Sequence, residues 1–294
     1  RGGAGGRGGG GGGRGMADTL PQAWRTYEHT PRYGTNYYAL RGRIAILSEA
    51  YSHDPFERRV KSTYAFVQEI LAFAAEKRVS ILALAERSDR NLAQGRISDV
   101  PVRGRMTTKP YRGPLVHEVI LPMGDTIQHE AGLGRGLRRT GRMKTTMLNI
   151  YDRFEPARTI KAPVAYIIPS IGTDSVVAML RKHGVVVERL RAPWTGAGET
   201  FTVDSLVRSN GRFEGHNEVR LEGKWNAGNI EAATGAYVVR TSQPLGVLAT
   251  VLLEPESDDG LTTWNFLDAL LAVGREYPVL RARAPVNAPA WRVE

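Results

Sequence analysis

Residues 164–190 read "VAYIIPSIGTDSVVAMLRKHGVVVERL", and this stretch alternates between two kinds of element. The apolar run at 164–168 is short and is closed by Pro169, which is typical of a buried strand. Residues 173–183, "TDSVVAMLRKH", carry apolar side chains at helical spacing, and Gly184 follows where a helix commonly ends on a left-handed residue. A second apolar run at 185–190 predicts another strand. The stretch therefore predicts one strand–helix–strand unit.

The chain on both sides of this unit favours strands. Short apolar runs bounded by turn residues predict strands at 115–121, 201–207, 236–240 and 247–253, and a further helix is expected after Ser257. Between residues 96 and 114 the pattern is broken by Pro101, Gly104, Pro110, Gly113 and Pro114. We therefore place a domain boundary there and predict an α+β, strand-rich accessory domain over residues 99–294.

Residues 16–98 have a different organisation. A short strand is predicted at 43–49, directly followed by a strong helix start at Asp54, with Pro55 at the first helical position. Apolar residues from Phe56 to Ala74 keep helical spacing, so this helix is expected to reach about residue 77. A continuation is expected to end near Gly95. Loop, strand, turn and long helix together indicate the end of an α/β domain.

Composition limits the classes of function. The chain has 294 residues, 41% of them hydrophobic, and no run of apolar residues long enough to span a membrane, so a soluble protein without membrane partners is expected. The sequence contains no cysteine, which excludes disulfides, thiolate metal sites and cysteine nucleophiles. The formal charge of +10 is scattered along the chain. Residues 1–15 form a Gly/Arg-rich leader that we expect to be disordered, and nucleic acid is an unlikely partner.

Metal and phosphate motifs are weak. The six histidines are 29, 53, 117, 129, 183 and 216, and none begins an H-x-x-E or H-E-x-x-H pattern. The glycines of 132–142, "GLGRGLRRTGR", lack the G-K-[ST] ending of a phosphate loop, which favours a solvated basic loop. The acids of 254–259, "EPESDD", could bind a hard cation, but capping of the following helix by Ser257 or Asp258 is the favoured interpretation.

Two longer segments resemble one enzyme family. Residues 31–71, "PRYGTNYYALRGRIAILSEAYSHDPFERRVKSTYAFVQEIL", combine a tyrosine-rich loop, a strand ending in S-E-A-Y and a D-P-F-E helix start. They resemble the closing segment of the catalytic domain in bacterial zinc carboxypeptidases of the carboxypeptidase A type. Residues 244–271, "PLGVLATVLLEPESDDGLTTWNFLDALL", resemble the C-terminal extension carried by one branch of that family. Together the two segments imply a C-terminal remnant of the α/β catalytic domain followed by the accessory domain.

The resemblance implies a specific chemistry. Glu49 matches the catalytic glutamate, which acts as general base on zinc-bound water and then protonates the leaving amine. Tyr27 and Tyr33 are candidates for the tyrosine that covers the C-terminal end of a peptide or protein substrate. The family's H-x-x-E pair, third histidine ligand and carboxylate-binding arginine are not found in this sequence. We therefore expect a fragment that binds no Zn²⁺ and is inactive alone, from an intact enzyme that is secreted or periplasmic.

Other interpretations remain open at this stage. From spacing alone, Glu49 could be an ordinary strand-end glutamate that pairs with Arg43 or Arg41. The strand-rich region could be a non-catalytic module that recognises peptide or glycan through an aromatic platform of Trp194, Phe213, Trp225 and Trp264. An RNA-associated protein that acts through residues 1–15 and the basic loop is a third possibility. Oligomeric state is not indicated by the sequence.

Overall fold

The computed structural model describes residues 23–50, 54–97, 99–122 and 137–294, without the side chains of residues 121, 122, 137 and 138. They divide into two compact units that interleave along the chain. The smaller unit comprises Arg1–Tyr27, Ala50–Thr63 and Thr107–Arg153, and the larger unit comprises Glu28–Glu49, Tyr64–Met106 and Phe154–Glu294. The leader at 1–15, His53, His129 and most of the 132–142 loop lie outside the described residues. The expected division of the chain into a remnant of a catalytic domain at residues 16–98 and an accessory domain at residues 99–294 stays a prediction.

The described elements follow one another along the chain as helices and strands of very different length. In order they are β1 (Ala23–Arg25), α1 (Gly34–Leu40), α2 (Phe56–Glu76), α3 (Arg78–Ala93), β2 (Asp99–Met106), β3 (Tyr111–Pro122), β4 (Leu137–Tyr151), β5 (Phe154–Lys161), β6 (Ala165–Ile168), α4 (Asp174–Lys182), β7 (Glu188–Leu190), β8 (Trp194–Arg208), β9 (Val219–Ala232), β10 (Tyr237–Arg240), α5 (Gly246–Leu253), the 3₁₀ helix η1 (Asp268–Leu270), β11 (Leu280–Ala282) and β12 (Ala290–Arg292). The mixed α/β class expected from the sequence is confirmed.

The larger unit is built on a seven-stranded sheet with the order β12-β7-β10-β6-β11-β8-β9. The predicted strand–helix–strand unit is confirmed as β6, α4 and β7, and Gly184 has the left-handed φ of 86° that ends the helix. β6 and β7 both pair antiparallel with β10, so they run parallel to each other on its two sides. A parallel pair needs a crossover connection, and α4 provides it.

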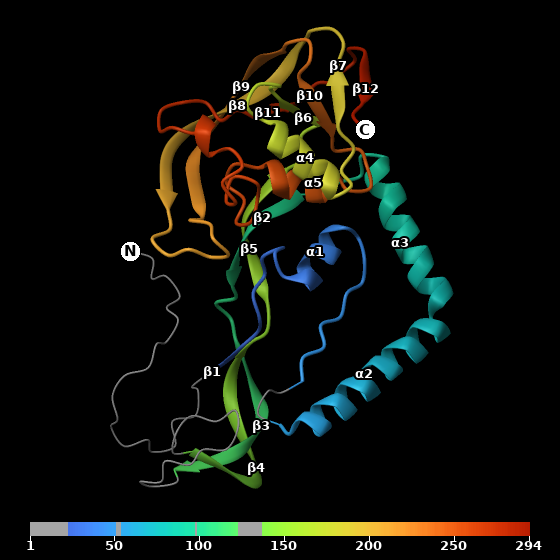
Figure 1. The fold of residues 1–294 in the computed structure, drawn as a ribbon, viewed down its shortest axis with the longest axis vertical. Coiled ribbons are helices and arrows are strands. Elements are labelled where there is room, and N and C mark those ends of the chain that lie inside the picture. The colour runs from blue at the N-terminus through green and yellow to red at the C-terminus, as the bar shows by residue number, and fades with distance from the viewer. Residues whose placement is uncertain (1–22, 51–53, 98, 123–136) are drawn as a thin grey trace. The chain divides into compact units, whose positions relative to one another are not determined.

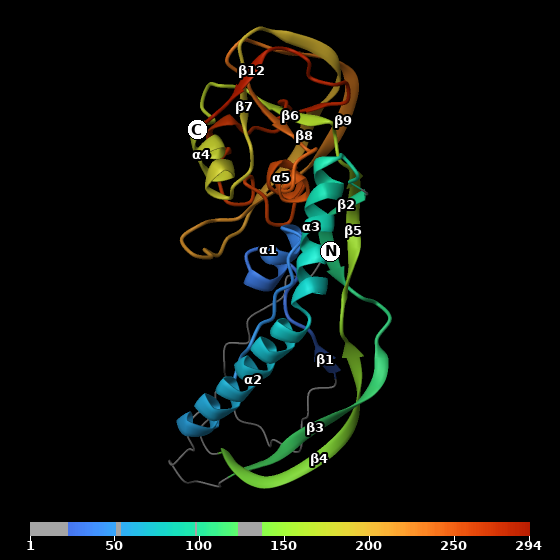
Figure 2. The same ribbon diagram turned by 90° about the vertical axis from the view of Figure 1, so that its right-hand side faces the viewer.

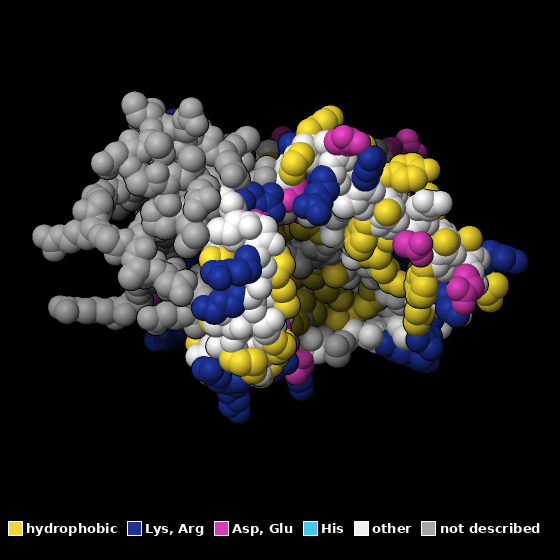
Figure 3. Space-filling model, turned by 90° about the horizontal axis from the view of Figure 1, so that it is seen from below, with side chains coloured by type: hydrophobic (Ala, Val, Ile, Leu, Met, Phe, Trp, Pro, Cys, Tyr) yellow, Lys and Arg dark blue, Asp and Glu magenta, His cyan; other side chains and the backbone are white. Residues whose placement is uncertain are grey.

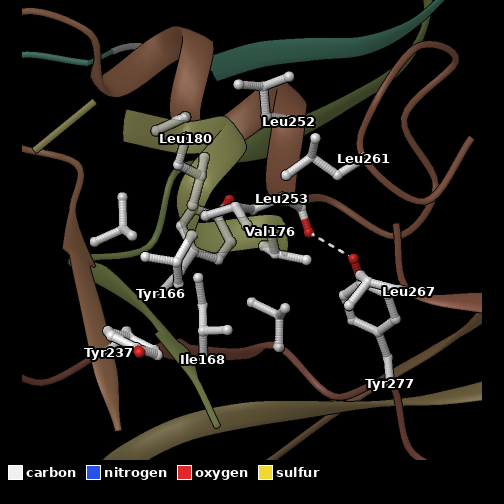
Figure 4. Packing of buried hydrophobic residues seen from close by; sticks show 14 of the residues in the cluster. Tyr166, Ile168, Val176, Leu180, Tyr237, Leu252, Leu253, Leu261, Leu267 and Tyr277 are labelled. Carbon is white, nitrogen blue, oxygen red and sulfur yellow. Dashed lines mark hydrogen bonds between the residues drawn. The ribbon is translucent and has the colours of Figure 1, made fainter. Parts of the chain in front are cut away.

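Successive side chains along a strand of this sheet point to opposite faces, and each face is covered by a hydrophobic core. Tyr166 and Ile168 of β6 belong to the larger core, which includes apolar residues of α4 and α5, whereas Ala165 and Ile167 point to a smaller core on the opposite face. Figure 4 shows the larger core and the hydrogen bond from the Tyr277 hydroxyl to the carbonyl of Leu253. Figures 1 and 2 show α4 and α5 lying next to each other. Burial of each large apolar side chain contributes about 1.5–3 kcal/mol.

A two-stranded antiparallel sheet, β2 and β5, adds a third, smaller core to the larger unit. Val100 and Val102 of β2 pack against Val251 of α5, with Leu40 of α1 beside them. The segment 28–49 therefore packs, through α1, against β2 and α5, which both follow it at a distance in the chain. The sequence did not predict α1, because residues 16–40 were interpreted as a loop.

The region 247–271 differs from the prediction in two ways. Residues 247–253 were predicted as a strand, but they form helix α5. No α-helix follows Ser257 in the described residues 258–294, where turns lead to the short 3₁₀ helix η1. α5 is apolar on every side because it is buried on every side, with residues 248–253 all below a tenth exposed. A short run without periodicity cannot be distinguished from a buried strand by its pattern alone.

The region 43–95 contains one confirmed and one wrong prediction. The two helices are confirmed as α2 and α3, and Gly95 ends α3 with a φ of 71°. The predicted strand at 43–49 is wrong, because these residues have no regular structure and Ile44, Ile46 and Leu47 are more than half exposed. The apolar stripe of α2 is exposed as well: Tyr64 is 70% and Leu71 is 64% exposed. Hydrophobic side chains also reach the surface beside Lys and Arg in the space-filling view (Figure 3).

The smaller unit is dominated by the long antiparallel hairpin of β3 and β4, to which β1 adds as a parallel strand. β3 contains the predicted strand 115–121. Arg139 of β4 forms ion pairs with Glu118 of β3 and with Asp54, the residue predicted to start α2. No helix in the described part of the chain combines the length and apolar character needed to cross a bilayer.

Candidate functional site

Glu49 lies on the irregular segment that follows α1. Its side chain is exposed, and it stands at the end of no strand. The two suggested arginine partners are engaged elsewhere: Arg43 makes a two-pronged ion pair with Asp89 of α3, at 2.9 and 2.7 Å, and Arg41 donates to the carbonyl of His183 at 2.6 Å. The expected placement of Glu49 at the end of a buried strand is therefore wrong. Its catalytic role stays a prediction.

The two tyrosine candidates have different surroundings. Tyr27 is exposed at 57% and belongs to the smaller unit, whereas Tyr33 is half-buried in the larger unit and directly precedes α1. Glu49 and Tyr33 line neither of the two cavities described below. The substrate-binding role of both tyrosines also stays a prediction.

The acidic loop 254–259 is a structural junction instead of a helix cap. Each acid pairs with a base elsewhere in the chain: Glu254 with Arg281, Glu256 with Arg158, Asp258 with His29 and Asp259 with Arg32. Burial raises the pKa of Glu256, and Arg158 and Arg103 offset only part of this effect. Burial also acts to raise the pKa of Asp258, but hydrogen bonds from His29 and the Gly104 amide outweigh it and lower that pKa. The predicted capping role of Ser257 and Asp258 is therefore wrong.

Arg32 is the best-connected residue of this junction. Its backbone amide and its guanidinium both donate to Asp259, at 2.5, 2.9 and 2.7 Å, and the guanidinium also pairs with Glu218. The same guanidinium lies over the rings of Phe213 and Trp264, 4.9 and 4.6 Å from their centroids, in cation–π geometry. Burial disfavours its charge, but the two carboxylates outweigh burial and raise its pKa. Arg32 thus joins the segment that resembles the catalytic domain to the C-terminal part of the larger unit.

A cavity of about 340 Å³ lies next to Arg32, and we call it the Trp264 cavity. Its apolar wall consists of Met179, Leu248, Leu252, Leu261, Trp264 and Phe266. Tyr37, His183 and His216 supply polar groups, and the ion-paired Arg32 and Asp259 also belong to the lining. An apolar pocket with a few convergent polar groups is the usual form of a small-molecule site.

The two imidazoles of the Trp264 cavity are held by hydrogen bonds at Nδ1. The Tyr37 hydroxyl lies 2.9 Å from Nδ1 of His183, and Oδ1 of Asn265 lies 3.0 Å from Nδ1 of His216. Burial is the largest cause that lowers the pKa of His183, and the charges of Arg41 and Lys182 add to it. His183 is therefore neutral at pH 7.

A second cavity, of about 290 Å³, lies beside His29, Phe154 and Asp258 in the same unit. Nε2 of His29 is 3.1 Å from the Asp258 carboxylate, and its ring lies 4.6 Å from that of Phe154. Within the described residues, no group of three or more His, Asp or Glu side chains is placed to hold a metal ion. Residues 216–218 read "HNE", and the two possible ligands among them are engaged elsewhere, since His216 bonds Asn265 and Glu218 bonds Arg32. The described residues therefore do not fit a zinc centre.

The four aromatic residues proposed as a platform do not form one surface. Trp194 is buried in the smaller core on one face of the sheet, and Trp225 packs against the larger core on the other face, with Arg281 3.6 Å from its ring centroid. Phe213 and Trp264 are half-buried and share Arg32. The four-residue platform is therefore wrong, and of the four residues Trp264 lines a cavity described above.

Sequence reasoning missed Arg32, Tyr37, His183 and His216 as a group. These residues are far apart in the chain, and none of them belongs to a short motif. The only available signal was the resemblance of 31–71 and 244–271 to two parts of one family, which suggested that the segments belong together but not that they are in contact.

The curated proteins to which this chain is similar share one name, carboxypeptidase 2. The chain is 26% identical over 237 residues to carboxypeptidase 2 of Trichophyton equinum, which covers 78% of this chain and 38% of that protein. It is 26% identical over 235 residues to carboxypeptidase 2 of Trichophyton tonsurans, a match that covers 77% of this chain and 38% of that protein. It is 29% identical over 155 residues to carboxypeptidase 2 of Trichophyton rubrum, a match that covers 50% of this chain and 28% of that protein. The chain is therefore similar to proteins named carboxypeptidase 2. It spans less than two fifths of the length of these relatives, which are fungal, and no family model and no solved structure matches it.

Proposed function

We propose that this chain is the C-terminal part of a metallocarboxypeptidase, which hydrolyses the C-terminal peptide bond of a peptide or protein. The observation that carries the proposal is the match of more than three quarters of the chain to proteins named carboxypeptidase 2. The S-E-A-Y and D-P-F-E segments around Glu49 support it from the sequence. Secretion of the intact enzyme is part of the same proposal.

In this proposal the chain supplies a base and a scaffold. An exposed glutamate can accept a proton from water once a substrate-binding surface surrounds it. The larger unit fixes the segment 28–41 through Arg32, Tyr37 and Arg41, so the chain leading to Glu49 starts from an anchored position. Zn²⁺ would act as Lewis acid on the substrate carbonyl in the intact enzyme. Because the described residues do not fit a zinc centre, its ligands would come from other residues, and the chain alone would be inactive.

A chimera tests the proposal. The part of the Trichophyton equinum carboxypeptidase 2 that precedes its matching region would be joined to this chain, and release of the last residue from a peptide would be measured. We expect release from a peptide with a free C-terminal carboxylate, none from the same peptide with a C-terminal amide, and none by the 294-residue chain alone. A folded chimera without activity, or equal cleavage of the amidated peptide, would contradict the proposal.

A further inference from the structure

The Trp264 cavity contains unused hydrogen-bonding capacity at two positions. Arg41 can only donate, and its Nη1 lies 3.0 Å from the Tyr37 oxygen, so Tyr37 accepts from Arg41. We assign the hydrogen of the Tyr37 hydroxyl to its contact with Nδ1 of His183, because this arrangement uses both the donor and the acceptor capacity of the hydroxyl. Nε2 of the neutral His183 then carries a hydrogen and is a donor. No hydrogen bond joins this Nε2 to any residue in the described part of the chain.

His216 has the opposite arrangement. Nδ2 of Asn265 donates to the carbonyl of Asn217 at 2.9 Å, so its Oδ1 is the atom that faces Nδ1 of His216. Nδ1 therefore carries the hydrogen, and Nε2 is the acceptor atom of this tautomer. This Nε2 is likewise without a hydrogen-bond partner among the residues that the structure describes. The residues that line the cavity thus offer one donor and one acceptor beside an apolar wall.

The charges around the cavity disfavour an anionic ligand. Arg32 is the cation of the cavity wall, and it is already paired with two carboxylates, Asp259 and Glu218. A carboxylate or phosphate entering the cavity would meet these acids and lose its water without gaining a free cation. The rings of Trp264 and Phe266, together with the leucines behind them, instead favour an aromatic group.

We propose that the Trp264 cavity is a binding site for a small neutral aromatic alcohol, a compound with one or two rings and a hydroxyl group. The ring packs against Trp264 and the apolar wall, and the hydroxyl accepts from His183 and donates to His216. A volume of about 340 Å³ holds one or two rings. This site is independent of the proposed peptidase function, since none of Glu49, Tyr27 and Tyr33 belongs to its lining.

Calorimetric titration of the 294-residue chain with three probes tests the chemistry. p-Cresol has the ring and the hydroxyl, toluene has the same ring without the hydroxyl, and 4-methylbenzoate replaces the hydroxyl by an anion. We expect p-cresol to bind about tenfold more tightly than toluene, which corresponds to about 1.4 kcal/mol, and 4-methylbenzoate not to bind. Equal affinity for p-cresol and toluene, or binding of 4-methylbenzoate alone, would overturn the proposal.

Two substitutions test the location. Met179 lies on the cavity wall on α4, and Ala178 beside it is exposed. Met179→Trp should fill the cavity and abolish binding of both p-cresol and toluene, whereas the matched control Ala178→Trp should leave both affinities unchanged. His216→Phe keeps a ring beside Trp264 and removes Nε2, so it should reduce p-cresol affinity about tenfold and leave toluene unchanged. The proposal would be overturned if the folded Met179→Trp variant kept its affinity for p-cresol. It would also be overturned if the unsubstituted chain bound no p-cresol up to about 10 mM.

Discussion

Helices α5 and α2 are opposite cases of the same element. α5 is eight residues long, apolar on every side and buried, whereas α2 is 21 residues long, carries one apolar stripe and has no buried residue. α5 was predicted as a strand and α2 was predicted correctly. A helix can be predicted from the residues that start it and from the helical spacing of its apolar residues. A helix that is buried on every side is apolar throughout, so it lacks this spacing and is easily predicted as a strand. Stability follows the opposite order, because burial and not propensity provides most of it.

Removing a leucine from each helix should show this difference directly. Leu253→Ala in α5 should reduce the free energy of unfolding by about 2–5 kcal/mol, because Leu253 is fully buried in the larger core and leaves a cavity. Leu71→Ala in α2 should change it by less than about 0.5 kcal/mol, since that side chain is 64% exposed and Ala is the better helix former. Urea unfolding measures both. Equal losses would mean that the stripe of α2 is covered in solution.

The two arginine–aspartate pairs extend the comparison to charged contacts. Asp259 has 2% of its side chain exposed, and Asp259→Asn should lower the free energy of unfolding by about 1.5–3 kcal/mol, because charged hydrogen bonds to Arg32 are lost. Asp89→Asn removes the partner of Arg43, which is 41% exposed, and should cost about 0–1 kcal/mol. Thermal unfolding of both variants distinguishes them. A larger loss for Asp89→Asn would contradict the role of Arg32 as the main anchor of residues 28–41.

The smallest expected effect is a pH dependence at His183. Its pKa is lowered in the folded chain by burial and by Arg41 and Lys182, so below the ordinary pKa of about 6.5 the unfolded chain binds a proton that the folded chain does not. Stability should therefore fall as the pH falls from about 7 to about 5. His183→Gln should flatten this part of the profile and leave the losses at lower pH, where carboxylates such as Asp258 titrate, unchanged. An identical slope in both proteins would exclude His183 as the cause.

Some elements of the structure could be predicted from the sequence and others could not, and particular residues show why. The β6–α4–β7 unit was predictable because Pro169 and Gly184 delimit it and α4 has two distinct faces. The 43–49 strand failed because an apolar run also occurs where a chain is exposed. The acids of 254–259 are each paired across more than 25 residues, so no local rule could separate pairing from capping. The residues that line the Trp264 cavity come from segments far apart in the chain, so no spacing in the sequence indicates that they lie together.

The role of Glu49 can be tested most directly in the chimera with the Trichophyton equinum carboxypeptidase 2. Glu49→Gln should lower kcat for release of the C-terminal residue by about 10²- to 10⁴-fold with little change in KM, because the base is lost and the shape is kept. Glu57→Gln, which alters another exposed glutamate eight residues later, is the matched control and should leave kcat unchanged. Full activity of the Glu49→Gln chimera would contradict the account.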